Sequence, residues 1–180
     1  MAKYTMDMVL EYAKVFAENA DMGDPNGNNI AKSIAEKGGQ YIVNAYFTSQ
    51  EDIDKLVADG LQQTILGNPR IIDGNAEYGI GKYMKIKRPV GDVIKTFENK
   101  RGPVEVNYGG PVGVVDLRDP SSKKWWSFEE DGPLGNGTKA KVQFDMYSNG
   151  SGLRLENVGV TELVEYEEYT PNDDDIFKVA

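Results

Sequence analysis

The segment between Lys82 and Arg101 carries cationic side chains whose spacing suits phosphate binding. Seven basic residues occur there with two acidic ones, Asp92 and Glu98; the basic residues are Lys82, Lys85, Lys87, Arg88, Lys95, Lys100 and Arg101. On an extended strand Lys85 and Lys87 project from one face, which Tyr83 shares. Cations neutralise phosphates and aromatic rings stack on unpaired bases, so this combination fits single-stranded nucleic acid. A merely solvated strand face is the alternative.

Other aromatic and basic residues could extend this surface. In an extended segment, neighbouring side chains such as Trp125 and Trp126 point to opposite sides, so one enters the core and the other lies nearer solvent. We interpret Trp126 as the exposed stacking ring, with both rings packed as the alternative. Tyr108 is a further candidate for stacking. Lys141 and Arg154, on either side of the SNGSG turn, are candidates for phosphate contact.

The residue types that are missing restrict the chemistry. The chain has no cysteine and no histidine. This excludes thiol nucleophiles, disulfides, Cys/His zinc sites and triads built on histidine. Histidine is also the commonest general base near neutral pH, so we expect a non-enzymatic protein without cofactor or metal. The enzymatic alternative is a carboxylate-based hydrolase using, for example, Asp116 and Asp119.

Charge is distributed unevenly along the chain. The net charge is −9, which by itself argues against a polyanionic ligand. Counting by segment gives −6 for residues 1–80, +4 for residues 81–141 and −7 for residues 142–180. This asymmetry predicts a basic binding surface followed by an acidic end.

The last residues have a composition of their own. Residues 167–180 are acidic and lack periodicity, so we expect a disordered tail. An acidic run with an apolar aromatic tip can dock in a basic pocket with a hydrophobic floor, on a partner or on the protein's own basic groove. The residues of this partner-binding motif are Asp173, Asp174, Asp175, Ile176 and Phe177.

Short strands must position these side chains. Alternation and turn residues predict strands over residues 8–17, 40–47, 83–88, 112–118, 140–147 and 153–166. In the last of these the apolar face shifts, which predicts a bulge near Asn157.

Two helices are expected between the strands. Residues 29–37 place Ile30 and Ile34 on one face. A second helix begins at a capping box formed by Thr48 and Glu51. Its apolar stripe consists of Ile53, Leu56 and Val57. Residues 64–80 are expected to form a loop.

About five short strands, one helix after the second strand and long loops predict a mainly β protein. The OB-fold, a five-stranded Greek-key barrel, is the leading candidate, and an immunoglobulin-like sandwich is the alternative. The length of 180 residues predicts one domain over residues 1–166, followed by the tail at 167–180. The chain contains no run of 18 apolar residues, so we expect no membrane span.

The order of these segments resembles that of bacteriophage single-stranded DNA-binding proteins of the T-odd podophage type. The resemblance covers about residues 8–177 and includes GGQYIVNAYFTSQED followed by the helix IDKLVADGL, then VGVVDLRDPSSKKW and GNGTKAKVQFDMY. Its most specific part is GLRLENVGVTELVEY, and DDDIF closes the pattern. Members of that family finish with a longer acidic tail that ends in phenylalanine, whereas here Phe177 is followed by Lys178, Val179 and Ala180.

The resemblance implies an OB-fold protein that binds single-stranded DNA without sequence specificity during phage DNA replication and recombination. It implies tail-mediated contact with the phage DNA polymerase and helicase–primase, formation of a homodimer, and action in the host cytoplasm. The alternative is a phage structural or assembly β-barrel protein that binds no nucleic acid. We find no residue dedicated to a 2′-hydroxyl, so the sequence leaves RNA open as a ligand.

Overall fold

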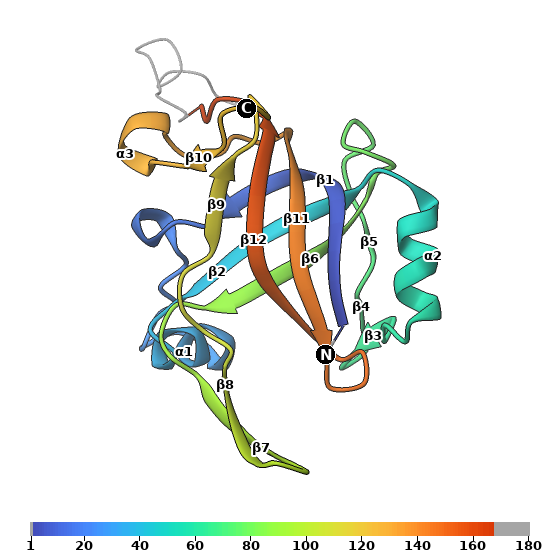
Figure 1. Ribbon diagram of the computed structural model, residues 1–180, viewed down its shortest axis with the longest axis vertical. Coiled ribbons are helices and arrows are strands. Elements are labelled where there is room, and N and C mark those ends of the chain that lie inside the picture. The colour runs from blue at the N-terminus through green and yellow to red at the C-terminus, as the bar shows by residue number, and fades with distance from the viewer. Residues whose placement is uncertain (1, 168–180) are drawn as a thin grey trace, which may run out of the picture.

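A large mixed β-sheet dominates the structure, a computed structural model that describes residues 2–167 (Figure 1). The strands are β1 (Ala2–Lys14), β2 (Gln40–Phe47), β3 (Thr64–Ile65), β4 (Asn68–Pro69), β5 (Ile72–Asp73), β6 (Lys82–Pro89), β7 (Ile94–Asn99), β8 (Gly102–Asn107), β9 (Gly113–Asp116), β10 (Lys124–Trp125), β11 (Thr138–Tyr147) and β12 (Gly152–Glu162). The helices are α1 (Asn29–Glu36), α2 (Gln50–Ala58) and α3 (Phe128–Asp131), with a 3₁₀ turn, η1 (Ala17–Asn19).

Eight strands form the main sheet in the order β10-β9-β12-β11-β1-β2-β6-β5. β1 pairs antiparallel with β11 and with β2, whereas β9 pairs parallel with β12. The sheet curls until β6 meets β12, where Arg154 and Lys87 form a single parallel ladder pair within the described chain. The predicted mainly β architecture is confirmed, but the predicted closed barrel is not formed, because this seam is not a continuous ladder.

The core lies on the concave side of this curled sheet. On β2, the side chains of Tyr41, Val43, Ala45 and Phe47 are all buried, as their alternation predicts. β6 buries Met84 and Ile86 in the same way. The bulge predicted near Asn157 is also confirmed: Gln143 pairs with Asn157 but Phe144 pairs with Leu155, which leaves Glu156 as the extra residue on β12.

The helix after β2 is present, but its predicted cap is wrong. Ser49 is the N-cap residue, and its hydroxyl accepts a hydrogen bond from the Asp52 amide at 3.3 Å. The Thr48 hydroxyl instead donates to the carbonyl of Asp7 on β1, at 2.9 Å. The predicted apolar stripe does face the core, with Ile53 and Leu56 buried.

The helix predicted over residues 29–37 is confirmed as α1, which lies beside the sheet. Its Asn28 cap accepts from the Ala31 amide at 2.9 Å. No residue of α1 is buried, and Ile30 is 72% exposed, so the predicted apolar face contributes little to the core. Gly23 lets the preceding loop touch α1, because a Cβ there would meet the Ala31 carbonyl.

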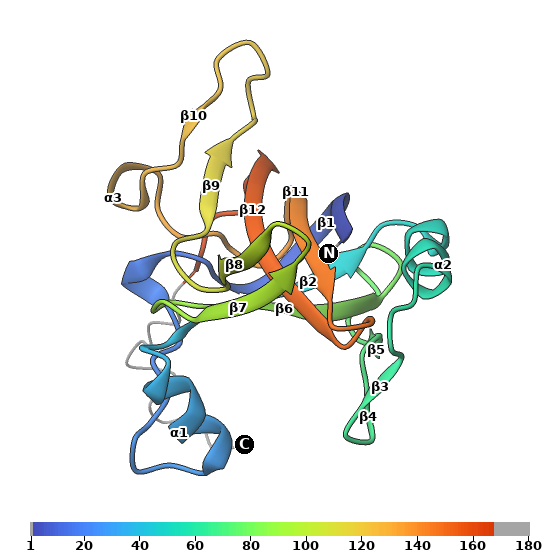
Figure 2. The same cartoon turned by 60° about the horizontal axis from the view of Figure 1, so that its bottom comes forward.

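Several elements differ from the expected ones. The region 64–80, expected to be a loop, contains the short strands β3, β4 and β5. β7 and β8 form an unexpected hairpin that projects from the body of the molecule in Figure 1 and lies toward the viewer in Figure 2. The expected strand at 8–17 begins earlier, at Ala2, and β9 is shorter than expected. None of the helices formed by the described residues is long and apolar enough to cross a membrane.

Candidate nucleic-acid interface

The outer face of β6 carries the central pair of predicted phosphate contacts. Lys85 and Lys87 are exposed and alternate with the buried Met84 and Ile86, as predicted. Tyr83 shares their face but is half-buried, because its ring packs against Tyr46 with centroids 4.9 Å apart. The strand therefore presents two cations to solvent, with a partly covered ring at one end.

Further cations surround Lys87. Partial burial lowers the pKa of the Lys87 ammonium, and the positive charges of Lys85, Lys37 and Arg70 lower it further. Asp21 acts in the opposite direction, but its effect is the smallest of these. We call the group formed by Lys37, Arg70, Lys85 and Lys87 the basic face. Its members repel one another, and that repulsion would be relieved by an anionic ligand.

Ion pairing divides the described cations into two groups, and Lys14, Lys32, Lys123 and Lys124 belong with the basic face to the group without a carboxylate partner. Six cations form ion pairs among residues 2–167: Lys3, Lys55, Arg118, Lys139, Lys141 and Arg154. All seven basic residues between Lys82 and Arg101 lack a carboxylate partner within 4.0 Å in that same range, as do Lys37 and Arg70. The charges of β6 and of the hairpin are thus not neutralised by a carboxylate of the described residues.

The β7–β8 hairpin extends this unpaired charge away from the sheet. Lys100 and Arg101 form its turn and are exposed. Lys95, on β7, lies over the ring of Tyr108 with its Nζ 5.1 Å from the ring centroid. The hairpin therefore carries two cations at its tip and one near its base.

Two predicted phosphate contacts, Arg88 and Arg154, serve the fold instead. The Arg88 guanidinium donates to the carbonyls of Gly109, Gly110 and Leu155 at 2.8–3.1 Å. Arg154 is buried, pairs with Asp145 at 2.6 Å and donates to the Asn107 carbonyl at 3.0 Å. These bonds occupy their donors at the seam between β6 and β12, so we remove both arginines from the candidate interface.

The prediction for the tryptophan pair is wrong in its assignment. Trp126 is 7% exposed, and its Nε1 donates to the Gly132 carbonyl at 2.8 Å. Trp125 is 74% exposed and is the ring available for stacking. The two do point to opposite sides, because β10 pairs with β9 and only one face of it meets the core.

Two further candidates lie elsewhere than predicted. Lys141 is exposed on β11 but forms a 3.0 Å ion pair with Asp7 of β1. Tyr108 is 5% exposed, so its ring is too enclosed to stack directly on a base. Of the predicted residues, β6 therefore carries Lys82, Tyr83, Lys85 and Lys87, and the turn of the projecting hairpin separately carries Lys100 and Arg101.

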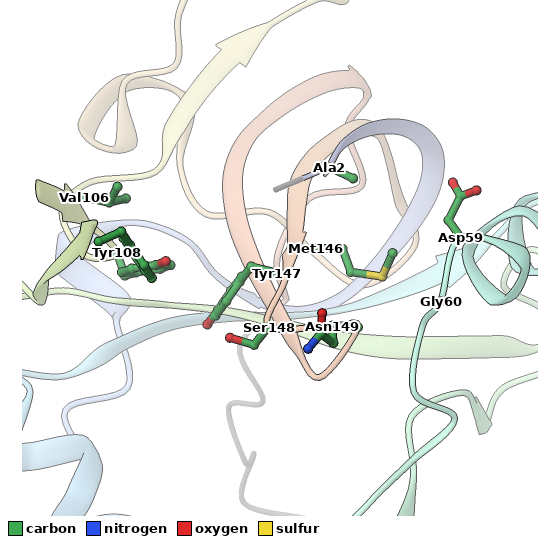
Figure 3. A pocket seen from close by; sticks show the side chains of 11 residues that line it. Ala2, Asp59, Gly60, Val106, Tyr108, Met146, Tyr147, Ser148 and Asn149 are labelled. Atoms are coloured by element: carbon green, nitrogen blue, oxygen red, sulfur yellow. The ribbon is translucent and has the colours of Figure 1, made fainter. Parts of the chain in front are cut away.

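A cleft beside the hairpin was not predicted from the sequence. Its volume is about 710 Å³, and its lining includes Phe97, Tyr108, Tyr147, Asn149 and Asp59 (Figure 3). We call it the hairpin cleft. A signal was available: Tyr147 ends a clear strand directly before a glycine turn, and Phe97 precedes the two-residue turn that joins two extended segments.

The two aspartates named as the enzymatic alternative, Asp116 and Asp119, are both hydrogen-bonded to side chains of neighbouring residues. Asp116 is buried and accepts two hydrogen bonds from Arg118, at 2.8 and 3.0 Å, which lower the pKa of its carboxyl to about 2. Asp119 accepts from the Ser121 hydroxyl at 2.7 Å, which lowers its pKa as well. Within the described chain no group of acidic side chains is arranged to hold a metal ion.

The predicted partner-binding motif, Asp173 to Phe177, lies outside the described residues. Within the described residues, the candidate interface consists of the basic face, the hairpin and the hairpin cleft. No model of a known protein family and no curated protein sequence matches this chain.

Proposed function

We propose that this protein binds single-stranded DNA without sequence specificity and acts in phage DNA replication and recombination. The observation that carries the proposal is the run of cations on β6 and the hairpin, none of which has a carboxylate partner among the described residues. A protein of net charge −9 does not need a local excess of unpaired cations for solubility. Such grouping favours a polyanionic ligand.

The proposed binding mechanism combines two physical effects. Lys82, Lys85, Lys87, Lys100 and Arg101 contact phosphates and release the counterions condensed on them. The half-buried ring of Tyr83 on β6 and the exposed ring of Trp125 on β10 stack on unpaired bases, which contributes about 1–3 kcal/mol per base without reading its identity. In duplex DNA these base faces are already stacked, so the mechanism favours single strands.

We further propose that the five core strands are an OB-type barrel. The pairing of β1 with β2 and β11, of β2 with β6 and of β11 with β12 supports this proposal, as does the parallel contact of β6 with β12. The OB-fold is a five-stranded, partly open Greek-key barrel, and its second and third strands form the oligonucleotide-binding face. Those strands correspond here to β2 and β6. Of the two, β6 carries Lys85 and Lys87.

The proposal includes a partner. An acidic segment ending in Ile176 and Phe177 has the chemistry to dock on a basic, apolar pocket of the phage DNA polymerase or helicase–primase. Recruitment of these enzymes would take place in the host cytoplasm, where single-stranded DNA is exposed during replication. We also propose that the protein forms a homodimer, as the resemblance to phage single-stranded DNA-binding proteins implies.

The test is a salt titration of binding to single-stranded and duplex oligonucleotides of the same sequence. We expect tight binding to the single strand only, with log affinity falling against log salt by about 0.7 per phosphate contacted. Lys85→Ala and Lys87→Ala should each weaken binding equally for unrelated sequences and reduce that slope by roughly one contact.

Lys139→Ala is the matched control. It removes the same charge from an exposed strand position, but from a lysine that is paired with Glu162 at 3.6 Å. We expect it to leave the slope unchanged. Binding that is insensitive to salt, or absent at low salt, would contradict the proposal and favour a structural β protein.

A further inference from the structure

The hairpin cleft contains a cluster of three aromatic rings. The ring of Tyr108 packs against that of Tyr147 with centroids 5.0 Å apart and against that of Phe97 at 6.3 Å. Tyr108 is buried, whereas Tyr147 is half-buried and Phe97 is 45% exposed. The enclosed ring therefore holds two accessible rings in place along one side of the cleft, as Figure 3 shows for Tyr108 and Tyr147.

Cations lie around the ring cluster. The Lys95 ammonium lies over one side of the Tyr108 ring, and the Arg154 guanidinium lies 5.2 Å from that ring's centroid. The positive charges of Arg154 and Arg70 act on the Tyr147 hydroxyl, although burial still raises its pKa and keeps it neutral. Lys95 makes no ion pair with a described carboxylate, so its charge remains available at the rim of the cleft.

The opposite end of the cleft is acidic. Asp59 follows α2 and accepts hydrogen bonds from the Tyr4 hydroxyl at 2.8 Å and from Lys55 at 3.2 Å. These bonds lower the pKa of the Asp59 carboxyl, so it is ionised at neutral pH. Both bonds reach Oδ2, so the other oxygen of this lysine-paired carboxylate, Oδ1, can accept a hydrogen bond from an N–H group on a base edge.

The turn between β11 and β12 is tied to the segment that follows α2, at the Asp59 end of the cleft. Its Gly150 carbonyl accepts from the Gln62 amide at 2.9 Å, and a Cβ on Gly150 would collide with the carbonyl of Gly60. The Arg70 guanidinium donates to the Ser151 carbonyl at 2.7 Å. The cleft is therefore held open by the fold itself, and its volume of about 710 Å³ lies within the usual range of about 300–1,000 Å³ for small-ligand pockets.

We propose that the hairpin cleft is a subsite for an unpaired base of the bound strand. The base stacks on Tyr147 and Phe97, its phosphate lies toward Lys95 and the hairpin tip, and its edge is directed toward Asp59. This inference rests on the proposed function, because it assigns one part of the same nucleic-acid interface. It adds a contact that depends on the base and not on the phosphate backbone.

The experiment compares two oligonucleotides of equal length, one of thymidines and one in which every residue is an abasic deoxyribose phosphate. We expect the wild-type protein to prefer the thymidine strand by about 5-fold to about 150-fold, the factor that stacking on one ring is worth. Tyr147→Ala and Phe97→Ala should reduce this preference while leaving affinity for the abasic strand unchanged. Tyr12→Ala, which removes an exposed tyrosine outside the cleft, is the matched control.

The outcomes separate this inference from the proposed function. Equal binding of both strands by the wild-type protein, with normal salt dependence, would overturn the subsite and the stacking part of the proposed mechanism, and would leave binding of single strands through phosphate contacts standing. A preference for thymidines that survives in both cleft variants would also overturn it. If neither strand binds at low salt, the proposed function fails and the subsite fails with it. The measured quantity is the ratio of the affinities for the thymidine and the abasic oligonucleotide, taken for each protein separately. A loss of stability in a variant lowers both affinities and therefore does not mimic the expected result.

Discussion

The carboxylate of Asp145 and the guanidinium of Arg154 form an ion pair 2.6 Å long inside the protein. The two residues face each other across the β11–β12 hairpin. Arg154 also donates to Glu156 at 2.8 Å and to the carbonyl of Asn107, which joins the end of β8 to the sheet. Burial raises the pKa of the Asp145 carboxyl, so the arginine compensates a charge that the interior disfavours.

Replacing Arg154 should therefore destabilise the protein strongly. Arg154→Met leaves the Asp145 carboxylate buried without its main partner, a change that typically costs about 3–5 kcal/mol. We expect a loss of this size in the free energy of unfolding, measured by urea denaturation at neutral pH. Lys139→Met, which breaks an exposed ion pair with Glu162, should cost less than about 1 kcal/mol. Similar losses in the two variants would show that the Asp145–Arg154 pair is solvated.

Acid should remove part of the stability through Asp116. Its two bonds from Arg118 lower the carboxyl pKa from 3.8 to about 2, so the folded protein favours the ionised form. That stabilisation is complete above the unfolded pKa and is lost as pH falls from about 4 to about 2. We expect the stability difference between wild type and Asp116→Asn to shrink over this interval when melting temperature is followed against pH. Parallel curves would contradict the assignment.

Substitution of the buried Trp126 should lower the stability of the protein, whereas substitution of the exposed Trp125 should not. Trp126→Ala removes a buried indole and should cost about 3–5 kcal/mol, whereas Trp125→Ala should change stability by no more than about 0.5 kcal/mol. Urea denaturation measures both. If single-stranded DNA reaches the exposed ring, quenching of fluorescence should persist in Trp126→Phe and disappear in Trp125→Phe. An absence of quenching in Trp126→Phe, where Trp125 is the remaining tryptophan, would exclude stacking on Trp125.

Deletion of residues 169–180 tests the acidic end. It removes three aspartates and one lysine and shifts the net charge from −9 to −7. A tethered acidic segment competes with DNA at a high effective concentration, so we expect the deletion to strengthen binding at low salt, with the gain fading as salt is added. Binding to a polymerase or helicase partner should be lost, and Phe177→Ala should reproduce most of that loss. Weaker DNA binding with intact partner binding would reject this competition.

The regular parts of the fold and of the basic face could be predicted because their pattern is local. Lys85 and Lys87 alternate with Met84 and Ile86, and this period of two is visible in the sequence. By contrast, the carbonyls that bind Arg88 lie 21, 22 and 67 residues along the chain, so its structural role has no local signal.

The same limit explains the other errors. Which of Trp125 and Trp126 faces the core depends on how β10 pairs with β9. The sequence of two adjacent tryptophans does not contain this information. The β7–β8 hairpin has almost no buried residue on either strand, so it lacks the alternation that identified the other strands. The contact between β6 and β12 likewise involves residues that lie far apart in the sequence.

The position of β1 in the sheet has a consequence for folding. Ala2 pairs with Met146 and Leu10 pairs with Thr138, so the earliest strand of this chain finds its β11 partner near the end of the described residues. Pairings so distant in sequence close slowly, because loop-closure entropy must be lost before the contact is gained. During synthesis one edge of β1 stays unpaired until β11 has emerged from the ribosome. The sheet therefore assembles as a late, cooperative event, and a nascent chain that stalls before β11 carries an open strand edge that is prone to aggregation.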